Sequence, residues 1–572
     1  MAGAATEGDM MVALIRRRPR LLLLLVCLIA WLPGLFTIPP LDRDESRFAQ
    51  ASKQMLETGN FIDIRFANEP RYKKPVGIYW LQAATTEAVS AVTGDRTRDH
   101  IWTYRIPSLI GAFAAVLLCF WCASAFLNVE GAFVAALLLG LTLLLSAEAK
   151  IAKTDAALLA TVVGAQAVLL RGYLAGRGEG QPLGRWAALG GWLALALGVL
   201  IKGPVIIGVV AVTLVALLIW DREWRWLGSL RPISGIALVL AIVLPWLIAI
   251  AVQSHGAFYA QSLGHDFGAK VLHGEESHGE PPGYYLLMTI LTLWPATLFL
   301  IPAVAFAIAN RQQPAMRFLL AWAAASWLMF ELVPTKLPHY ILPAYPALAV
   351  IMAAFLVGRR EIATGWQKVL PALSSLHFAL GAALLVAGLI FLPAYYGSGA
   401  PAAVLTGAGL GTLAALVAVL SMLLGAMGRA FWSAVVSALV LYATLTLGAM
   451  PGLTKIWVSP REAQMIRSHA QADDPPPVLA GYTEPSALFL LGTPTHLAVN
   501  GRGAAEMASA QGGLAAIEKG QQAVFLQTLA QLNASATPID ALDGFNYSRG
   551  RPVHITLFRV TPAPRTTEPP PE

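Results

Sequence analysis

The 572-residue sequence is poor in charged residues, and this shortage narrows the class of protein. Asp, Glu, Lys and Arg make up 13% of the chain, whereas a soluble globular protein carries about 25%. The composition therefore excludes an ordinary soluble enzyme, and its 56% of hydrophobic residues predicts a polytopic α-helical membrane protein. The net charge of +7 does not indicate nucleic-acid binding, because Lys and Arg orient the helices of a membrane protein.

Cysteine is also scarce, and internal repeats are missing. The three cysteines are Cys27, Cys119 and Cys122, and each lies within an apolar run. This placement excludes a disulfide framework or a four-cysteine metal site and favours small core residues. No segment of the chain repeats another, which argues against the repeated halves of many transporters.

Long apolar runs are plentiful instead, and thirteen of them predict transmembrane helices. They lie at 21–38, 105–127, 131–149, 154–173, 187–203, 204–220, 232–252, 284–308, 316–333, 338–357, 368–394, 402–424 and 430–450. Arginines precede the first run and recur in all but one of the even-numbered connections. Because positive residues stay on the cytoplasmic side, we expect a cytoplasmic N-terminus over 1–20 and a transmembrane domain over 21–452.

The remaining long segments are predicted to lie on the outer side of the membrane. They are the first loop, 39–104, a lid-like loop, 253–283, and a C-terminal domain, 453–560, followed by a Pro-rich tail, 561–572, expected to be disordered. In the first loop, RFAQASKQMLETGN places its apolar residues on one helical face. This spacing predicts an amphipathic helix on the membrane surface that ends at Gly59-Asn60.

The C-terminal segment alternates helical and strand patterns. A Ser-Pro start predicts a helix over SPREAQMIRSHA. Short β-rich runs predict strands at PVLAGY, THLAV, QAVFL and HITLFRV. The alternation predicts a small α/β domain.

Charged residues at the outer ends of the spans gather in five places. These are Asp44 with Arg47, RYKKP at 71–75, AEAKIAKTD at 147–155, IKGP at 201–204 and TKLPHY at 335–340. Ionisable groups at membrane depth usually face a bundle interior or a wet cavity and are functional candidates. The topology therefore predicts one charged layer on the outer side.

Each of these charges also has a purely structural interpretation. Asp42 and Glu45 have the spacing of a helix-capping box, which we favour for Asp42, and Asp44 with Arg47 has the spacing of a local ion pair. An alternative role for Lys73 and Lys74 is to anchor to lipid headgroups, and an alternative for Lys150 and Lys153 is to extend to the membrane interface. Asp155, at the mouth of a span, is harder to explain structurally and is expected to be a positioned charge.

The lid-like loop 253–283 contains several histidines and carboxylates, among them His265. A divalent metal site is one interpretation of this content. The loop has no tight HxxxH or HExxH spacing, so a hydrophilic lid over a site is favoured and no metal ligands are assigned.

The charged layer suits one kind of substrate. Cations there would hold a phosphate or pyrophosphate, and a nearby carboxylate would orient or deprotonate an acceptor or stabilise an oxocarbenium-like centre. A molecule with a phosphorylated polar head and a long apolar tail fits both halves of such a site. The pattern therefore predicts a polyprenyl-phosphate sugar as substrate.

Several motifs also resemble a known family. DRDESRFAQASKQMLETGNF followed by RYKKPVGIYWL, and then AEAKIAKTDAALLA, LIKGP and KLPHYILPAYPALA, are similar to motifs of the lipid-linked-sugar glycosyltransferases of the C superfamily. The likeness covers about residues 40–350. It is greatest to the bacterial aminoarabinose transferases of lipid A modification, which are related to protein O-mannosyltransferases.

The resemblance implies an inverting hexosyl- or pentosyltransferase on the periplasmic face of the bacterial inner membrane, with an undecaprenyl-phosphate-type donor. By position, Asp44 is the catalytic carboxylate, Asp155 the second acidic residue near the reacting groups, and Arg47 and Lys74 bind the donor phosphate. Lys73 joins these phosphate-binding cations as their neighbour. The residues expected to line the substrate cavity are Lys150, Lys202, Lys336, His339, Tyr340 and His265.

One position departs from the aminoarabinose transferases, which tend to have an acidic residue where this chain has Lys73. A second cation there favours a neutral or acidic sugar, or a more anionic acceptor. Lipid A or another envelope glycolipid is the expected acceptor, and glycosylation of exported proteins is the first alternative. A polyprenyl-lipid transporter or flippase is an alternative from another class, indicated by the helix-interrupting Gly203-Pro204.

Overall fold

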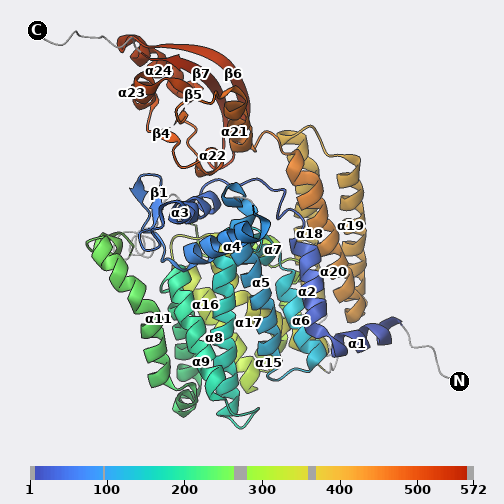
Figure 1. Ribbon diagram of the computed structural model, residues 1–572. Coiled ribbons are helices and arrows are strands. Elements are labelled where there is room, and N and C mark those ends of the chain that lie inside the picture. The colour runs from blue at the N-terminus through green and yellow to red at the C-terminus, as the bar shows by residue number, and fades with distance from the viewer. Residues whose placement is uncertain (1–6, 95–96, 263–279, 359–368, 563–572) are drawn as a thin grey trace, which may run out of the picture.

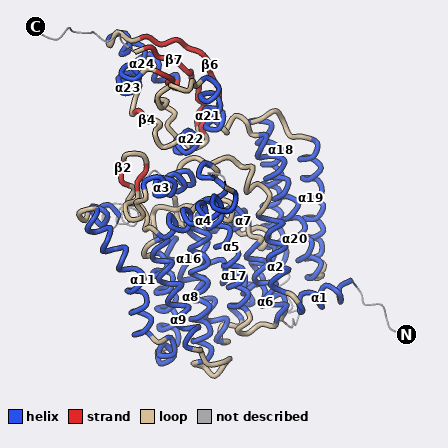
Figure 2. Tube along the Cα trace, in the orientation of Figure 1, coloured by secondary structure: helices blue, strands red, loops and turns tan. Residues whose placement is uncertain are grey.

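The computed structural model describes residues 7–94, 97–262, 280–358 and 369–562. A bundle of long helices forms the larger part, and a small domain of strands and helices sits on one end of it (Figure 1). Figure 2 shows that the strands lie in this small domain, apart from a short hairpin in the first loop. The expected helical membrane architecture is therefore confirmed.

Nine helical segments of the described chain are long and apolar enough to cross a membrane. They are α5 (Ile101–Ala123), α8 (Asp155–Ala175), α9 (Arg185–Lys202), α11 (Pro232–Gln253), α16 (Pro314–Leu332), η4 with α17 (Pro338–Val357), α18 (Val369–Tyr396), α19 (Ala402–Leu423) and α20 with η6 and η7 (Met427–Gly452). Shorter apolar helices occupy four other predicted spans: α2 (Pro19–Trp31), α6 (Val129–Gly140), α10 (Val205–Asp221) and α15 (Thr297–Ala309).

Two predicted spans are divided into two helices each. The run 131–149 forms α6 and then α7 (Leu143–Glu148), because Thr142 turns the chain and its hydroxyl caps α7 by accepting from the Leu145 N–H. The run 284–308 forms α14 (Tyr284–Thr292) and α15, with Pro295 between them, which has no N–H to continue a helix. Outside the first loop and the C-terminal domain, the described chain also contains α1 (Glu7–Arg17), η2 (Arg225–Leu230) and α12 (Ala257–Tyr259).

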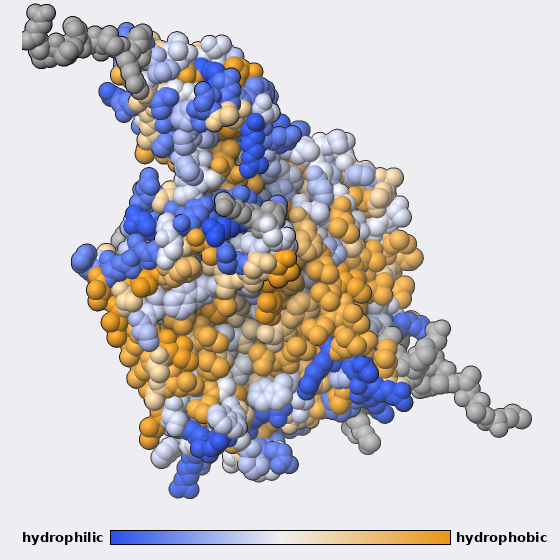
Figure 3. Space-filling model, viewed as in Figure 1, coloured by the Kyte–Doolittle hydropathy of each residue, from blue (hydrophilic) through white to orange (hydrophobic). Residues whose placement is uncertain are grey.

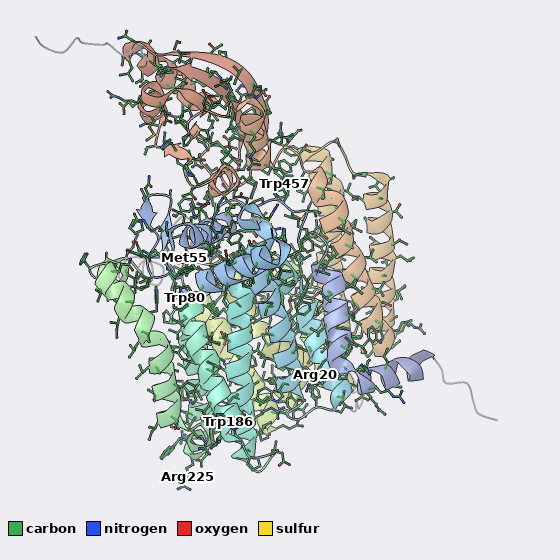
Figure 4. The ribbon with its side chains drawn as sticks, viewed as in Figure 1. Arg20, Met55, Trp80, Trp186, Arg225 and Trp457 are labelled. Atoms are coloured by element: carbon green, nitrogen blue, oxygen red, sulfur yellow. The ribbon has the colours of Figure 1, made fainter. Side chains whose placement is uncertain are left out.

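The surface of the bundle is banded. On the face shown in Figure 3, hydrophobic side chains cover its middle, and hydrophilic side chains gather toward both ends. Met55, Trp80 and Trp457 lie near the C-terminal domain, whereas Trp186 and Arg225 lie at the opposite end (Figure 4). The arginine-bearing connection at 222–231 is therefore far from the first loop, as the predicted topology requires.

The first loop forms a folded layer on the bundle. It contains α3 (Asp44–Thr58), the hairpin of β1 (Arg65–Phe66) and β2 (Glu69–Pro70), the helix α4 (Gly77–Thr93), which the sequence patterns did not single out, and η1 (Thr97–Asp99). The helix α3 ends at Gly59, which is left-handed with φ 69°, as predicted. Its polar face is not exposed to solvent, however, because the C-terminal domain packs against it. At this contact the Gln50 amide donates to the Thr493 hydroxyl at 2.7 Å.

The predicted capping box at the start of α3 is wrong. The helix begins at Asp44, its N-cap residue is Arg43, and no side chain caps it. Asp42 instead faces the C-terminal domain, where its N–H donates to the Tyr547 hydroxyl at 2.7 Å and its carboxylate accepts from the Ser486 hydroxyl.

The C-terminal domain is built on one mixed five-stranded sheet. The strand order is β4-β3-β5-β7-β6, with parallel pairs among β4, β3 and β5 and antiparallel pairs among β5, β7 and β6. The strands are β3 (Val478–Ala480), β4 (His496–Ala498), β5 (Gly513–Glu518), β6 (Ser535–Asn546) and β7 (Arg551–Thr561). The helices are α21 (Val458–His469), α22 (Pro485–Leu491), α23 (Gly501–Gln511) and α24 (Lys519–Gln531).

The strand predicted at QAVFL is wrong, because these residues belong to α24. The buried residues of this helix are Phe525, Thr528 and Leu529, which have the i, i+3, i+4 spacing of one helical face. The pattern over QAVFL alone was too short to show this period. The predicted helix over SPREAQMIRSHA and the strands at PVLAGY, THLAV and HITLFRV are present as α21, β3, β4 and β7.

Candidate active site

A cavity of about 310 Å³ lies between the first loop and the ends of α8, α9 and η4 that face the C-terminal domain. It brings together residues from all five charged places that the sequence singles out. Its lining consists of Asp42, Arg43, Asp44, Arg47, Phe48, Arg71, Lys73, Lys74, Lys153, Thr154, Asp155, Lys202, Thr335, Leu337, His339 and Tyr340. Seven cationic side chains and three carboxylates therefore share one space among the described residues.

The first turn of α3 presents Asp44 and Arg47 to this cavity. The Asp44 carboxylate is exposed to the cavity and makes no hydrogen bond or ion pair with the described residues. Burial would raise the pKa of Asp44, but the charges of Lys153, Arg71, His339 and Arg47 hold it below its usual range. The positive N-terminal end of α3 acts in the same direction. Asp44 is therefore an ionised, unengaged carboxylate at neutral pH.

Arg71 is a site residue that the sequence reasoning did not single out, although RYKKP contains it. Its side chain is 9% exposed and lies 5.1 Å from the centre of the Phe48 ring. Its Nε has no hydrogen-bond partner among the described residues. A buried guanidinium with a free donor is well suited to bind a phosphate oxygen. In the sequence, the feature that could have identified Arg71 as a site residue was its position three residues before Lys74.

Asp155 has a different environment from Asp44. It begins α8 and accepts a hydrogen bond from the Lys202 ammonium, while Lys153 Nζ lies 3.4 Å and His339 Nε2 3.9 Å from its other oxygen. Lys153 also pairs with Glu148 at 3.0 Å. Asp155 is thus neutralised by protein cations, which suits it to hold those cations in place.

Lys153 lines this cavity and pairs with Glu148, although the sequence patterns assigned neither residue to the site. Both lie within AEAKIAKTD, which the charged layer includes. Extension toward the membrane interface was an adequate explanation for Lys153 in the sequence alone. The structure instead turns its ammonium into the protein, where it reaches His339 Nδ1 at 3.4 Å.

Tyr340 and His339 of η4 also line the cavity. The Lys202 ammonium lies 5.2 Å from the centre of the Tyr340 ring, and the rings of His339 and Tyr340 are 4.9 Å apart, edge to face. These contacts place the end of α9 against η4. They give the cavity one aromatic wall beside its charges.

Three residues expected in this cavity are not among its lining. The backbone at Thr335–Leu337 is extended, so Thr335 and Leu337 point into the cavity and Lys336 points away from it. Lys336 is buried and donates to the Glu280 carbonyl at 2.9 Å. Lys150 lines a separate, smaller cavity. His265 lies outside the described residues.

A buried ion pair fixes the loop that carries Asp44. Arg105 on α5 donates to both Glu45 oxygens at 2.8 and 3.0 Å, and both side chains are almost fully buried. The Glu45 carboxylate also accepts from the N–H groups of Leu41 and Ala152 at 2.8 Å each. This network ties the start of α3 to α5 and to the segment before α8.

No group of three or more His, Cys, Asp or Glu side chains is arranged to hold a metal ion in the described chain. His265 and most of the other acidic and histidine residues of the lid-like loop lie outside it. The divalent metal considered from the sequence therefore stays a prediction about that loop.

In its sequence and its fold, this chain resembles membrane glycosyltransferases. The family model described as dolichyl-phosphate-mannose-protein mannosyltransferase matches residues 73–248. The structure is similar to ArnT from Cupriavidus metallidurans bound to undecaprenyl phosphate, with a TM-score of 0.70 over 94% of this chain and 97% of that one, at 19% identity. It also resembles the archaeal oligosaccharyltransferase AglB from Archaeoglobus fulgidus, with a TM-score of 0.50 at 11% identity over 97% of this chain and 75% of that one.

Within this class, the curated relatives are undecaprenyl phosphate-alpha-4-amino-4-deoxy-L-arabinose arabinosyl transferases. One of them is arabinosyl transferase 2 of Pseudomonas fluorescens (strain Pf0-1). This chain is 30% identical to it over 352 residues, which are 61% of each protein. It is 30% identical to the enzyme of Pseudomonas aeruginosa PAO1 over 339 residues, which are 58% of this chain and 59% of that enzyme. The matches thus span about three fifths of these relatives. The predicted resemblance to lipid-linked-sugar glycosyltransferases is confirmed.

Proposed function

We propose that this protein transfers a sugar from a polyprenyl-phosphate donor to an envelope acceptor on the periplasmic face of the bacterial inner membrane. The observation that carries the proposal is the Asp44 carboxylate, ionised and unengaged, in a cavity with Arg47, Arg71 and Lys74. The similarity to aminoarabinose transferases supports the same class of donor. We further propose thirteen membrane crossings, with the C-terminal domain in the periplasm.

The cations bind the donor phosphate, and the polyprenyl tail extends along the apolar bundle. In the transfer, the bond between the sugar C1 and the phosphate oxygen breaks, and its electron pair leaves with polyprenyl phosphate. The acceptor oxygen bonds to C1 from the opposite face, which inverts the configuration. A hydroxyl acceptor gives its proton to Asp44, whereas an ionised phosphate acceptor needs only to be positioned.

The positive charges of the cavity also indicate which class of sugar is transferred. Lys73 lines it together with six other cationic side chains of the described chain, so a positively charged amino sugar would meet repulsion. We therefore propose a neutral or acidic sugar, transferred to lipid A or another anionic glycolipid. Aspartates at 42, 44 and 155 are the three carboxylates in the same lining, and Asp155 is already neutralised by Lys202.

The test is transfer by the purified protein from synthetic polyprenyl-phosphate sugars to lipid A, with neutral, acidic and amino sugars compared. We expect Asp44→Asn to lower the rate at least about 100-fold with a hydroxyl acceptor, since general-base catalysis typically contributes that much. With an ionised phosphate acceptor, the loss should be smaller because no proton moves. Thermal unfolding should be unchanged.

Glu69→Gln is the matched control, because Glu69 is an exposed acid of the same loop. A wild-type rate for Asp44→Asn with both kinds of acceptor would refute the catalytic assignment. Use of the amino sugar donor alone would refute the proposed sugar class. Labelling of exported proteins in place of lipid A would favour the protein-glycosylating alternative, which the family match over 73–248 supports.

A further inference from the structure

A second cavity, of about 110 Å³, lies beside the active-site cavity. Ile38 and Leu41, from the segment between α2 and α3, and Leu143 of α7 form part of its wall. Tyr442 of α20 and Met450 of η7 form another part. Between them stand Leu445 and Thr446 of η6 (Thr444–Ala449), a π-helical turn, a feature that often marks functional sites. The walls are thus mostly apolar.

Lys150 lines this cavity and is the unusual residue in it. Its side chain is 7% exposed, and its ammonium makes no hydrogen bond or ion pair with any described residue. Burial without a counter-charge lowers the pKa of Lys150 to about 8. An unpaired buried ammonium is unfavourable, so the site is incomplete without an anion.

The other polar groups of this cavity are already satisfied. The Tyr442 hydroxyl donates to the Leu141 carbonyl at 2.8 Å, and the Thr446 hydroxyl donates to the Tyr442 carbonyl at 2.8 Å. The Ser146 hydroxyl contacts the Gly140 carbonyl and the Trp31 indole N–H. The Lys150 ammonium is therefore the polar group of this cavity that has no partner among the described residues. A single negative charge would balance it.

The two cavities lie on either side of the same two segments of chain. Leu41 and Ile151 line the smaller cavity, whereas Asp42 and Lys153 line the active-site cavity. The Glu45 carboxylate joins these segments by accepting from the N–H groups of Leu41 and Ala152. A ligand at Lys150 is therefore separated from the active site by a fixed wall.

We propose that the Lys150 cavity binds the phosphate of an anionic membrane lipid. One cation among apolar walls matches one phosphodiester attached to apolar tails, and anionic phospholipids are the abundant membrane anions of that kind. The cavity accommodates the headgroup phosphate, while the tails extend along the apolar helices. This site is distinct from the donor site and does not depend on the proposed function.

The test uses the purified full chain in neutral detergent and follows thermal unfolding during lipid titration. Dioctanoyl phosphatidylglycerol is the probe, dioctanoylglycerol supplies the same tails without phosphate, and inorganic phosphate supplies the anion without tails. We expect the phosphatidylglycerol to stabilise the wild type. Lys150→Met should weaken its apparent affinity about tenfold or more, since it removes a charge-assisted contact.

The variants separate binding from folding. Without lipid, Lys150→Met should unfold at the same or a higher temperature, because it removes an unpaired buried charge, and Lys150→Arg should keep the lipid response. Lys519→Met, at an exposed lysine of the C-terminal domain, should respond like the wild type. Lys74→Met should also keep this response while losing sugar transfer.

Two results would overturn the proposal. One is an equal response of wild type and Lys150→Met to phosphatidylglycerol. The other is stabilisation by inorganic phosphate or dioctanoylglycerol that matches stabilisation by the phospholipid, since the site would then recognise a free anion or an apolar chain alone.

Discussion

At the scale of single residues, Arg71 shows how a site residue escapes detection in the sequence. Asp44, Arg47, Lys74 and Asp155 stand in motifs that carry the family resemblance, and the structure brings all four into one cavity. Arg71 opens the same motif as Lys74, but its importance depends on burial against Phe48. Burial of one arginine among several in a charged loop is decided by tertiary packing, which local patterns do not record.

Arg71 is expected to contribute to donor binding. Arg71→Met should lower kcat/KM for the donor about 10- to 100-fold, because it removes a charge-assisted hydrogen bond to the phosphate. Most of the loss should appear in the KM for the donor. Arg71→Lys should recover part of it, since a lysine keeps the charge without the planar donor group.

Steady-state kinetics with varied donor concentration measures this effect. Arg65→Met is the matched control, because Arg65 lies in the neighbouring hairpin with 43% of its side chain exposed and pairs locally with Asp63 at 3.2 Å. A donor KM that stays unchanged in Arg71→Met would exclude Arg71 from phosphate binding.

At the scale of helices and strands, apolar length and periodicity predicted much of the bundle. Each apolar helix from α2 to α20 overlaps a predicted span. The failures have local causes, such as the turn at Thr142 that divides one run. The helix α4 was missed because it packs inside the first loop, where Gly77 allows close contact with the end of α9: a Cβ there would lie 2.7 Å from the Leu200 carbonyl oxygen.

The contact between α3 and α5 leads to a stability prediction. Glu45→Gln leaves the Arg105 guanidinium buried without its counter-charge, which should lower the free energy of unfolding by about 3–5 kcal/mol. Adding Arg105→Met should restore part of this loss, since the unpaired charge is then removed. Thermal and chemical unfolding in detergent would measure both variants.

An exposed ion pair of the same loop provides the comparison. Arg98 pairs with Glu87 at 3.1 Å, with 34% and 55% of their side chains exposed, so Glu87→Gln should change the free energy of unfolding by less than about 1 kcal/mol. If Glu45→Gln is no more destabilising than Glu87→Gln, the buried pair does not hold the start of α3.

At the scale of the whole molecule, the position of the C-terminal domain could not be predicted from the sequence. Its contacts with the first loop join residues far apart in the chain: Gln50 meets Thr493, and Asp42 meets Ser486 and Tyr547. No local pattern indicates such pairs. This contact lies beside the candidate site, because Asp42 lies two residues before Asp44 and also lines the cavity.

Asp42 makes this contact sensitive to pH. Burial and, to a smaller extent, the nearby Glu484 raise the pKa of Asp42 to about 7, while the Ser486 hydrogen bond and Arg43 oppose the shift. Burial also raises the pKa of Glu462, which faces Asp42 from α21. Because the docked state holds the Asp42 proton more tightly than an exposed aspartate does, docking is favoured below about pH 4 and weakens as pH rises to about 7.

The docking equilibrium constant should therefore fall by up to about tenfold per pH unit between about pH 4 and 7, and Asp42→Asn should remove the part due to Asp42. Hydrogen–deuterium exchange of α3 and α22 would measure the docking. The exchange rate of the wild type is divided by that of Asp42→Asn at each pH, because this ratio cancels the intrinsic pH dependence of exchange. Exchange in the wild type should rise relative to Asp42→Asn as pH increases. Glu506→Gln, at an exposed acid of α23, should follow the wild type, and a constant ratio for Asp42→Asn would show that this carboxylate does not control docking.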